Sequence, residues 1–168
     1  LNTFGPLKAS GPDEIKPIVL QMLNMNYIEQ LTRNYQGIIQ TGYTPRSWRN
    51  MSVVFIPKVG KSDYAKPKAY RPITLSSFLL KGLERVIQWY LLEKEIPRFL
   101  PHQHAYTKSL SCDTALSTFI DAIESAVYRK QMCLAVSLDC SGAFDRINFN
   151  SANRALNKQG VSKCITNW

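Results

Sequence analysis

The sequence has few acidic residues, two histidines and no cysteine pair with metal-site spacing. Only 12 Asp and Glu oppose 21 Lys and Arg, so the formal net charge is +9 at pH 7. The cysteines form no C-x-x-C pair, and His102 and His104 lie far from most of them, which argues against a zinc site. We expect free, mostly buried thiols in a reducing compartment. The cysteines are Cys112, Cys133, Cys140 and Cys164.

Long hydrophobic runs are also missing. No apolar run approaches the ~18 residues that a membrane-spanning helix needs, and the first residues lack the pattern of a secretion signal. We therefore expect an intracellular protein. The chain opens with Leu1 rather than Met and ends at Trp168 without a stopping signal, so we expect both ends to be cuts through a longer protein.

The bulk composition is that of a globular domain with a basic surface. The 168 residues are 45% hydrophobic and 20% charged, enough for one domain with a core. Nine basic residues and two acidic ones lie between Arg46 and Arg85. This concentration favours an anionic partner, nucleic acid or nucleotide, over a merely soluble basic protein.

The periodicity predicts several helices. Ser10 to Asp13 is a turn that leads into a helix with acidic residues in its first turn. Apolar positions follow a broken helical period over 15–31, and a second helix is expected over 28–39, ending near Gly42. Helical spacing also predicts helices over 79–91, over 116–127, and from Phe144 to about residue 160.

Short apolar runs predict strands. Residues 52–57 have the composition of a short buried strand, and residues 70–75 are predicted to form a second short strand. The basic loop 58–69 between them would make a hairpin with a basic tip. Residues 132–138 are predicted to form a buried central strand that ends at Asp139. The order of elements is mixed α/β with a small sheet.

Asp139 carries the strongest chemical signal. A charged residue directly after an apolar strand needs a partner, and strand ends often display ligands. A hard cation such as Mg²⁺ prefers carboxylate and phosphate oxygens, so Asp139 is a candidate metal ligand. The alternative is an Asp that caps the following helix, which is the commoner role for a lone Asp at such a turn.

The sequence around Asp139 favours the role of metal ligand over that of helix cap. Residues 135–145 read AVSLDCSGAFD, which resembles the first catalytic motif of reverse transcriptases; in non-LTR (LINE-type) retrotransposons this motif reads D-x-x-x-A-F-D. Every fixed position of this motif matches here, at Asp139, Ala143, Phe144 and Asp145.

The resemblance implies a role for each of these residues. Asp139 would hold both Mg²⁺ ions of a two-metal phosphoryl-transfer site, with the backbone carbonyl of Cys140 as a further ligand. Phe144 would lie under the sugar and exclude a ribose 2′-OH, although simple core packing is an alternative. Asp145 would organise the turn or pair with a nearby base.

Other segments match the same family in the expected order. Residues 8–15, KASGPDEI, resemble K-x-x-G-P-D-G-I, with Glu14 in place of the usual Gly. Residues 48–61 and 70–77 resemble the two fingers motifs, which implies that Lys58 and Arg71 grip the triphosphate of the incoming nucleotide. For Lys66 and Lys68 a solvated surface charge is the favoured interpretation.

Residues 103–116 resemble the Q-x-G-F-x-x-G-x-S-T segment that precedes the catalytic motif. By this match Gln103 and Ser111 would contact the template or primer, while Ala105 and Ser109 replace glycines and Cys112 replaces Thr. The resemblance covers about residues 4–160, and its wording favours the Jockey or R-element side of the family.

The resemblance implies a right-hand polymerase fold in incomplete form. Residues 1–110 would be fingers, with the basic hairpin near 52–75, and residues 111–168 the start of a palm, built on a small antiparallel sheet with packed helices. The implied partners are an RNA template, a DNA primer, deoxynucleoside triphosphates and the rest of a polyprotein. The resemblance also implies that the protein is found in the cytoplasm and the nucleus as part of a ribonucleoprotein.

A second acidic motif of the family, [FY]-x-D-D, is not found in this sequence. No Asp-Asp pair occurs, and no acidic residue follows Asp145. We therefore expect the chain alone to be inactive, because one carboxylate does not complete a two-metal site. Two alternatives stay open: a non-catalytic remnant or domesticated protein that binds RNA or DNA, and an RNA-binding domain of the intron-maturase type.

Overall fold

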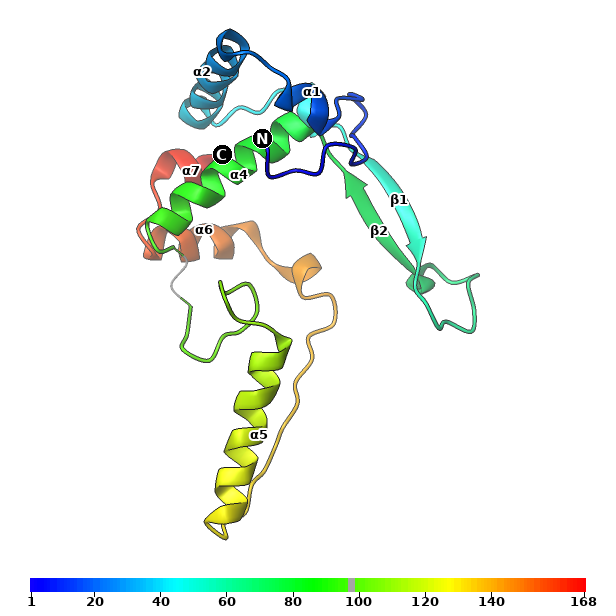
Figure 1. Cartoon of the computed structure of the whole chain (residues 1–168), viewed down its shortest axis with the longest axis vertical. Helices are drawn as coiled ribbons and strands as arrows, with labels where there is room; N and C mark the ends of the chain where they lie inside the picture. Colours follow the sequence, from blue (N-terminus) through cyan, green and yellow to red (C-terminus); the bar gives the residue numbers. More distant parts are fainter. Residues whose placement is uncertain (97–98) are drawn as a thin grey trace. The chain divides into compact units, whose positions relative to one another are not determined.

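The computed structural model describes residues 1–96 and 99–168, with the backbone alone at Phe144 (Figure 1). The chain forms two compact units. The larger unit comprises Leu1–Lys94 and Gly160–Trp168, and the inserted unit comprises Glu95–Gln159. Mixed helices and one two-stranded antiparallel sheet, β1–β2, agree with the predicted α/β class.

Most elements belong to the larger unit. Its elements are α1 (Pro17–Gln21), α2 (Met25–Thr41), α3 (Arg46–Arg49), β1 (Ser52–Pro57), η1 (Pro67–Ala69), β2 (Tyr70–Leu75), α4 (Phe78–Glu93) and α7 (Lys163–Asn167). The inserted unit contains α5 (Cys112–Tyr128), η2 (Phe144–Arg146) and α6 (Phe149–Lys158). Among the described residues, no helix combines the length and apolar character needed to cross a membrane.

Capping fixes the ends of the long helix α2. The side chain of Asn24 accepts a hydrogen bond from the Tyr27 N–H at 3.3 Å, which satisfies an exposed donor of the first turn. Gly42 ends the helix with φ +68°, a left-handed conformation that glycine adopts at low cost. The helix predicted to end near Gly42 therefore forms, and it begins at Met25, three residues earlier than the sequence pattern indicated.

The predicted acidic first turn at the N-terminus is wrong. The helix after the Ser10–Asp13 turn begins only at Pro17, with Lys16 as its N-cap, and no acidic residue lies in its first turn. Pro17 explains this boundary, because proline fits the first helical position and pushes the preceding residue into extended conformation. Residues 22–24 then separate α1 from α2, where the sequence showed a broken period.

The core of the larger unit lies between α2 and α4. Its buried residues are Tyr35, Ile38, Leu83 and Ile87. Leu83 is fully buried, and removing a leucine side chain from water stabilises a fold by about 1.5–3 kcal/mol. Trp48 and Trp168 pack on this cluster, and Trp48 meets Tyr35 edge to face with ring centroids 6.0 Å apart.

Tyr35 joins the two helices through its hydroxyl. The Tyr35 Oη–H donates to the backbone carbonyl of Leu79 at 2.8 Å. Burial raises the pKa of Tyr35 to about 12, so the phenol stays neutral and keeps donating over the physiological pH range. The hydroxyl lies over Gly82, where a Cβ atom would approach Oη to about 2.5 Å.

This contact predicts opposite effects for two helical glycines. We expect Gly82→Ala to destabilise the larger unit by about 1–3 kcal/mol, because the new methyl group displaces Tyr35 from its site. Gly37→Ala in α2 meets no atom within 4 Å, and we expect it to stabilise the fold by about 0.5–1 kcal/mol through helix propensity. Urea denaturation of both variants measures the difference, and equal shifts of the same sign would contradict the packing described.

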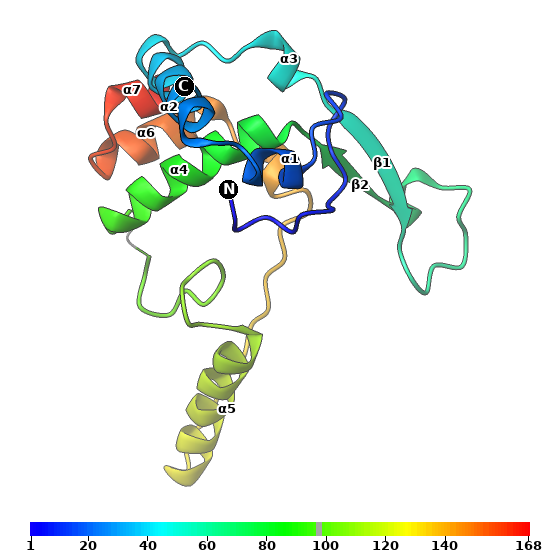
Figure 2. The same cartoon turned by 45° about the horizontal axis from the view of Figure 1, so that its top comes forward.

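Helix α7 closes the larger unit from the far end of the chain. The Trp168 indole N–H donates to Thr44 Oγ1 at 2.9 Å, across 124 positions of sequence. Ile165 and Trp168 pack against the core cluster, and Figure 2 shows α7 beside α2. The last residues of the chain therefore complete a core that begins with residues of the first quarter.

The predicted hairpin forms, with its register set by Ser52↔Leu75 and Pro57↔Tyr70. The predicted burial of the first strand is wrong: all six residues of β1 are exposed, including Phe55 at 64%. An isolated two-stranded ribbon has no covering layer, so its apolar side chains stay in contact with water. Figures 1 and 2 show this ribbon with the loop 58–69 at its end.

The predicted central strand is also wrong. Residues 132–138 are adjacent to α5 in sequence but form no strand, and their side chains are exposed, with Leu138 at 90%. A strand needs a hydrogen-bonded neighbour, and the described residues of the inserted unit supply none to this segment. The helices predicted on either side do form, as α5 and as η2 followed by α6.

The cysteines are free, as predicted, but their expected burial is wrong. All four thiols are exposed. Cys133 and Cys140 lie in or next to the extended segment that has no strand partner, and Cys112 starts α5. The exposure of Cys133 and Cys140 follows from the missing cover over this segment.

Candidate functional site

Asp139 lies in an open loop of the inserted unit. An exposed hollow of about 560 Å³ is lined by Asp139, Cys140, Ser141, Ala143 and Arg146. The loop turns at Gly142, whose φ is +60°, and the Arg146 N–H donates to the Gly142 carbonyl at 3.1 Å, which starts the short helix η2. The carboxylate of Asp145 lies beside this turn, with Oδ2 3.5 Å from where a Gly142 Cβ would stand.

The donor set around Asp139 suits part of a divalent metal site. A carboxylate and the neighbouring carbonyl of Cys140 are the oxygen ligands that hard cations prefer. Among the described residues, no group of three or more His, Cys, Asp or Glu side chains comes together. Asp139 and Cys140 line the same hollow and offer oxygen ligands of this kind, but a single carboxylate does not complete a two-metal site.

Asp139 does not cap helix α6. The N-cap of α6 is Asn148, whose side chain accepts from the Asn150 N–H at 2.8 Å. Asp139 instead precedes the Gly142 turn and is exposed. The predicted position of Phe144 falls in η2, but its side chain lies outside the described part of the structure.

The hairpin places Lys58 and Arg71 on the same face. Ile56 pairs with Arg71, and the Lys58 N–H donates to the Ala69 carbonyl at 2.8 Å, which continues the ladder by one step. Because side chains alternate along a strand, Lys58 shares the face of Ile56 and Arg71. The Lys58 ammonium donates to the Lys68 carbonyl at 2.9 Å, so it rests on the hairpin's own backbone.

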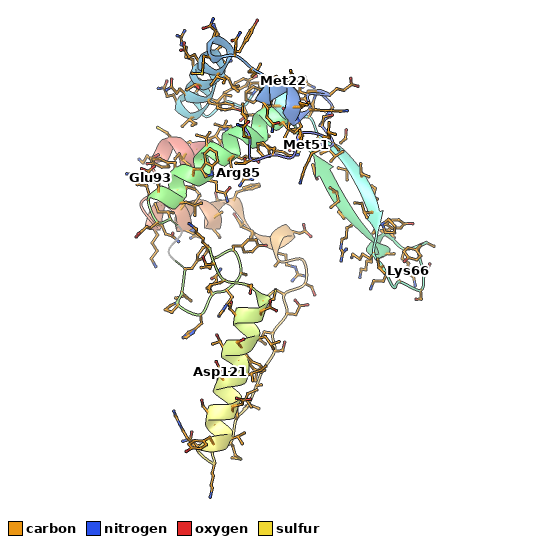
Figure 3. The ribbon with its side chains drawn as sticks, viewed as in Figure 1. Met22, Met51, Lys66, Arg85, Glu93 and Asp121 are labelled. Carbon is orange, nitrogen blue, oxygen red and sulfur yellow. The ribbon has the colours of Figure 1, made fainter. Side chains whose placement is uncertain are left out.

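The hairpin tip is ordered by aromatic and ionic contacts. Tyr64 and Tyr70 meet edge to face with ring centroids 6.2 Å apart, and the Tyr64 hydroxyl donates to the Lys58 carbonyl at 2.9 Å. Lys66 pairs with Asp63 at 3.2 Å and stays largely exposed, at the end of the hairpin in Figure 3. An exposed pair of this kind contributes little to stability.

Two residues that stand where the resembled motifs have glycine adopt a left-handed backbone conformation. Glu14, in the K-x-x-G-P-D-G-I segment, has φ +57°, and Ser109, in the segment before the catalytic motif, has φ +65°. The turn near Glu14 is tight: the Asp13 carboxylate accepts from the Ile15 N–H at 3.3 Å, and Gly11 packs on the backbone of Ser76. The chain thus keeps the glycine conformation without the glycine, at a steric cost.

Restoring glycine is expected to stabilise the fold. Glu14→Gly should raise the free energy of unfolding by about 0.5–1 kcal/mol, because relief of the left-handed strain exceeds the extra entropy of the unfolded chain. Glu29→Gly in α2 is the matched control and should lower stability by about 1 kcal/mol. Denaturant titration of both gives the signs, and a destabilised Glu14→Gly would refute the strain.

Gln103 and Ser111 are held by their own loop. Ser111 is the N-cap of α5: its hydroxyl accepts from the Thr114 N–H at 3.3 Å, and its own N–H donates to Thr114 Oγ1 at 2.9 Å. The Gln103 amide donates to the Ala105 carbonyl at 3.4 Å. These bonds give Ser111 a structural role that the sequence pattern did not reveal.

Sequence reasoning missed a second hollow in the inserted unit. A polar depression of about 490 Å³ is lined only by amide and guanidinium side chains along α6 and its N-cap. They are Asn148, Asn150, Asn153, Arg154 and Asn157. The signal was present as asparagines at helical spacing in the sequence FNSANRALNK.

The chain belongs to the reverse transcriptase family. The family's profile, described as reverse transcriptase (RNA-dependent DNA polymerase), matches residues 56–168, which include Lys58, Arg71 and the Asp139 loop. The resemblance drawn from the sequence motifs is thereby confirmed.

Relatives within the family come from retrotransposons. The chain is 33% identical over 145 residues to the probable RNA-directed DNA polymerase from transposon BS of Drosophila melanogaster, covering 84% of this chain and 16% of that protein. It is 28% identical to the RNA-directed DNA polymerase from mobile element jockey of the same species, over 83% of the chain and 15% of the relative. The polyprotein of retrotransposable element R2 from Popillia japonica is 29% identical, over 83% and 19% respectively. The chain therefore spans less than one fifth of the length of these relatives.

Proposed function

We propose that this chain is part of an RNA-directed DNA polymerase of a non-LTR retrotransposon, and that it supplies the nucleotide-gripping hairpin and the first metal-binding carboxylate. The observation that carries the proposal is the D-x-x-x-A-F-D loop at Asp139, which lies inside the region that matches the reverse transcriptase family. Residues 1–110 would act as fingers and residues 111–168 as the start of a palm.

In this proposal the chain's own residues bind and orient the reactants. Asp139 and the carbonyl of Cys140 would hold Mg²⁺, which when bound neutralises charge on the transferring phosphoryl group. Asp145 would keep the Gly142 turn in shape, since its carboxylate lies beside that turn. The ring of Phe144 would select deoxynucleotides by occupying the space of a 2′-OH.

Lys58 and Arg71 would bind the triphosphate. Their common face on the hairpin is the supporting observation, because two cations on one face can meet the same polyanion. Arginine offers a planar fork for phosphate oxygens, and lysine offers a mobile point charge. Lys58 would leave the Lys68 carbonyl to do so, which exchanges a neutral acceptor for a charged one.

The proposed partners are an RNA template, a DNA primer, deoxynucleoside triphosphates and the remainder of a polyprotein. Gln103 and Ser111 would lie along the template or primer. A ribonucleoprotein of cytoplasm and nucleus is the proposed location. A second candidate function is nucleic-acid binding without polymerisation, which fits the isolated chain because it carries a net charge of +9 and its sequence contains no Asp-Asp pair.

Primer extension tests the proposal. We expect the 168-residue chain to show no extension of a DNA primer on an RNA template with Mg²⁺, because its metal ligands are incomplete. A longer protein that adds an [FY]-x-D-D hairpin to this chain should extend the same primer. Extension by the short chain would overturn the expected inactivity, and a silent longer protein would overturn the polymerase function.

A further inference from the structure

Helix α6 carries an unusual polar face. Asn150, Asn153 and Asn157 recur at helical spacing, so they line one side of α6 together with Arg154. Asparagine is a poor helix former, whereas an ordinary solvent-facing helix uses Glu, Lys, Gln or Ala. The asparagines therefore lower the intrinsic helix propensity of α6 and place amide groups along this face.

Two side chains of this face are held by hydrogen bonds to neighbours on the same helix. The Asn157 side-chain N–H donates to Asn153 Oδ1 at 2.6 Å, and Arg154 Nη2 donates to Ser151 Oγ at 3.3 Å. These contacts restrict the side chains, which lowers the entropy that a ligand must remove on binding. Each amide has a second N–H, and the guanidinium has further N–H donors. This set of donors suits a partner that is rich in hydrogen-bond acceptors.

The charge of the surrounding chain has one sign. Residues 146–168 contain no acidic residue, and their charged side chains are Arg146, Arg154, Lys158 and Lys163. Arg154 therefore has no carboxylate on its own helix to pair with. A hollow lined by amide and guanidinium groups, without a carboxylate, suits phosphate oxygens and the edges of bases.

We propose that the asparagine-rich face of α6 binds the nucleic acid strand that the polymerase works on, with Arg154 on a phosphate and the amides of Asn153 and Asn157 on phosphate, sugar or base-edge acceptors. The inference rests on the proposed function, since it extends the nucleic-acid path from the Asp139 loop onto the next helix. Only Ile147 and Asn148 separate η2 from α6, so a strand held at the loop has this face directly downstream in sequence.

Alanine substitution tests the face without weakening the helix. We would measure fluorescence anisotropy of a labelled DNA primer annealed to an RNA template, with the 168-residue chain, at several salt concentrations. Asn153→Ala together with Asn157→Ala should raise Kd about tenfold with an unchanged salt dependence, because two neutral hydrogen-bonding groups are lost. Arg154→Ala should raise Kd and reduce the slope of log Kd against log salt by about one.

The controls separate this inference from the broader function. Alanine favours helices, so far-UV circular dichroism should show α6 retained or strengthened in every variant. Asn26→Ala, on the exposed surface of α2, is the matched control and should leave Kd unchanged. If the unmodified chain binds and the α6 variants bind equally well, or if the control loses as much affinity, the α6 inference is overturned while the polymerase proposal stands. If the unmodified chain does not bind at all, the α6 inference is overturned, whereas the polymerase proposal is decided by primer extension with the longer protein.

Discussion

Asp139→Asn is expected to lower the rate of RNA-templated extension by at least about 10³-fold in a polymerase-competent protein that contains this chain. The substitution keeps the size and polarity of the side chain but removes the negative charge that attracts a divalent cation. Since Asp139 is exposed and no hydrogen bond to its side chain supports the loop among the described residues, folding should change little. The measurement is single-turnover extension under saturating nucleotide.

The comparison that gives this result meaning is Asp121→Asn. Asp121 is exposed on α5 in the same unit, away from the Asp139 loop in sequence (Figure 3), and the same chemical change there should leave extension unaffected. Template binding, measured without nucleotide, should be nearly intact in both variants. Retention of more than a tenth of the extension rate by Asp139→Asn would remove Asp139 from the metal site.

Lys58→Ala and Arg71→Ala should each raise the KM for deoxynucleoside triphosphate about 10–100-fold, with a smaller effect on template affinity. A charge-assisted hydrogen bond to phosphate contributes about 1.5–3 kcal/mol, which corresponds to this range. Arg71→Lys should recover part of the loss, because it restores the charge and not the planar fork. Steady-state extension at varied nucleotide concentration gives these values.

Lys66→Ala provides the matched control for the hairpin. Lys66 lies on the same loop but is exposed and pairs with Asp63, so its removal should not change the nucleotide KM. A rise in KM as large as that of Lys58→Ala would mean that the hairpin acts through its general charge. The specific grip of Lys58 and Arg71 would then be wrong.

The elements that local sequence determines were predicted well. The pairing of 52–57 with 70–75 depends on β-branched runs separated by a turn-rich loop, and α4 and α5 depend on a helical apolar period. Long-range features were predicted poorly. Residues 132–138 have the composition of a strand, yet a strand forms only when a neighbour accepts and donates its hydrogen bonds. The exposure of β1 has a different long-range cause, because β1 pairs with β2 but no further layer covers the ribbon.

The candidate site was predictable only in part for a related reason. The motif around Asp139 is continuous in sequence, and the helical turn predicted after it forms as η2, but the strand predicted before it does not form. The role of Ser111 as a helix cap and the left-handed turns at Glu14 and Ser109 depend on backbone geometry, which composition does not encode. The helical spacing of the asparagines in α6 can be recognised in the sequence, but the hollow that they line is seen only in the structure.

The closure of the larger unit by α7 has a consequence for synthesis in the cell. The chain leaves this unit at Lys94 and returns at Gly160, so ribosomes deliver the inserted unit before the residues that complete the first core. The bond between Thr44 and Trp168 spans a sequence separation that raises contact order, which slows folding. Until Trp168 emerges, α2 and α4 keep part of their apolar surface open, and this is the interval in which a nascent chain would depend on chaperones.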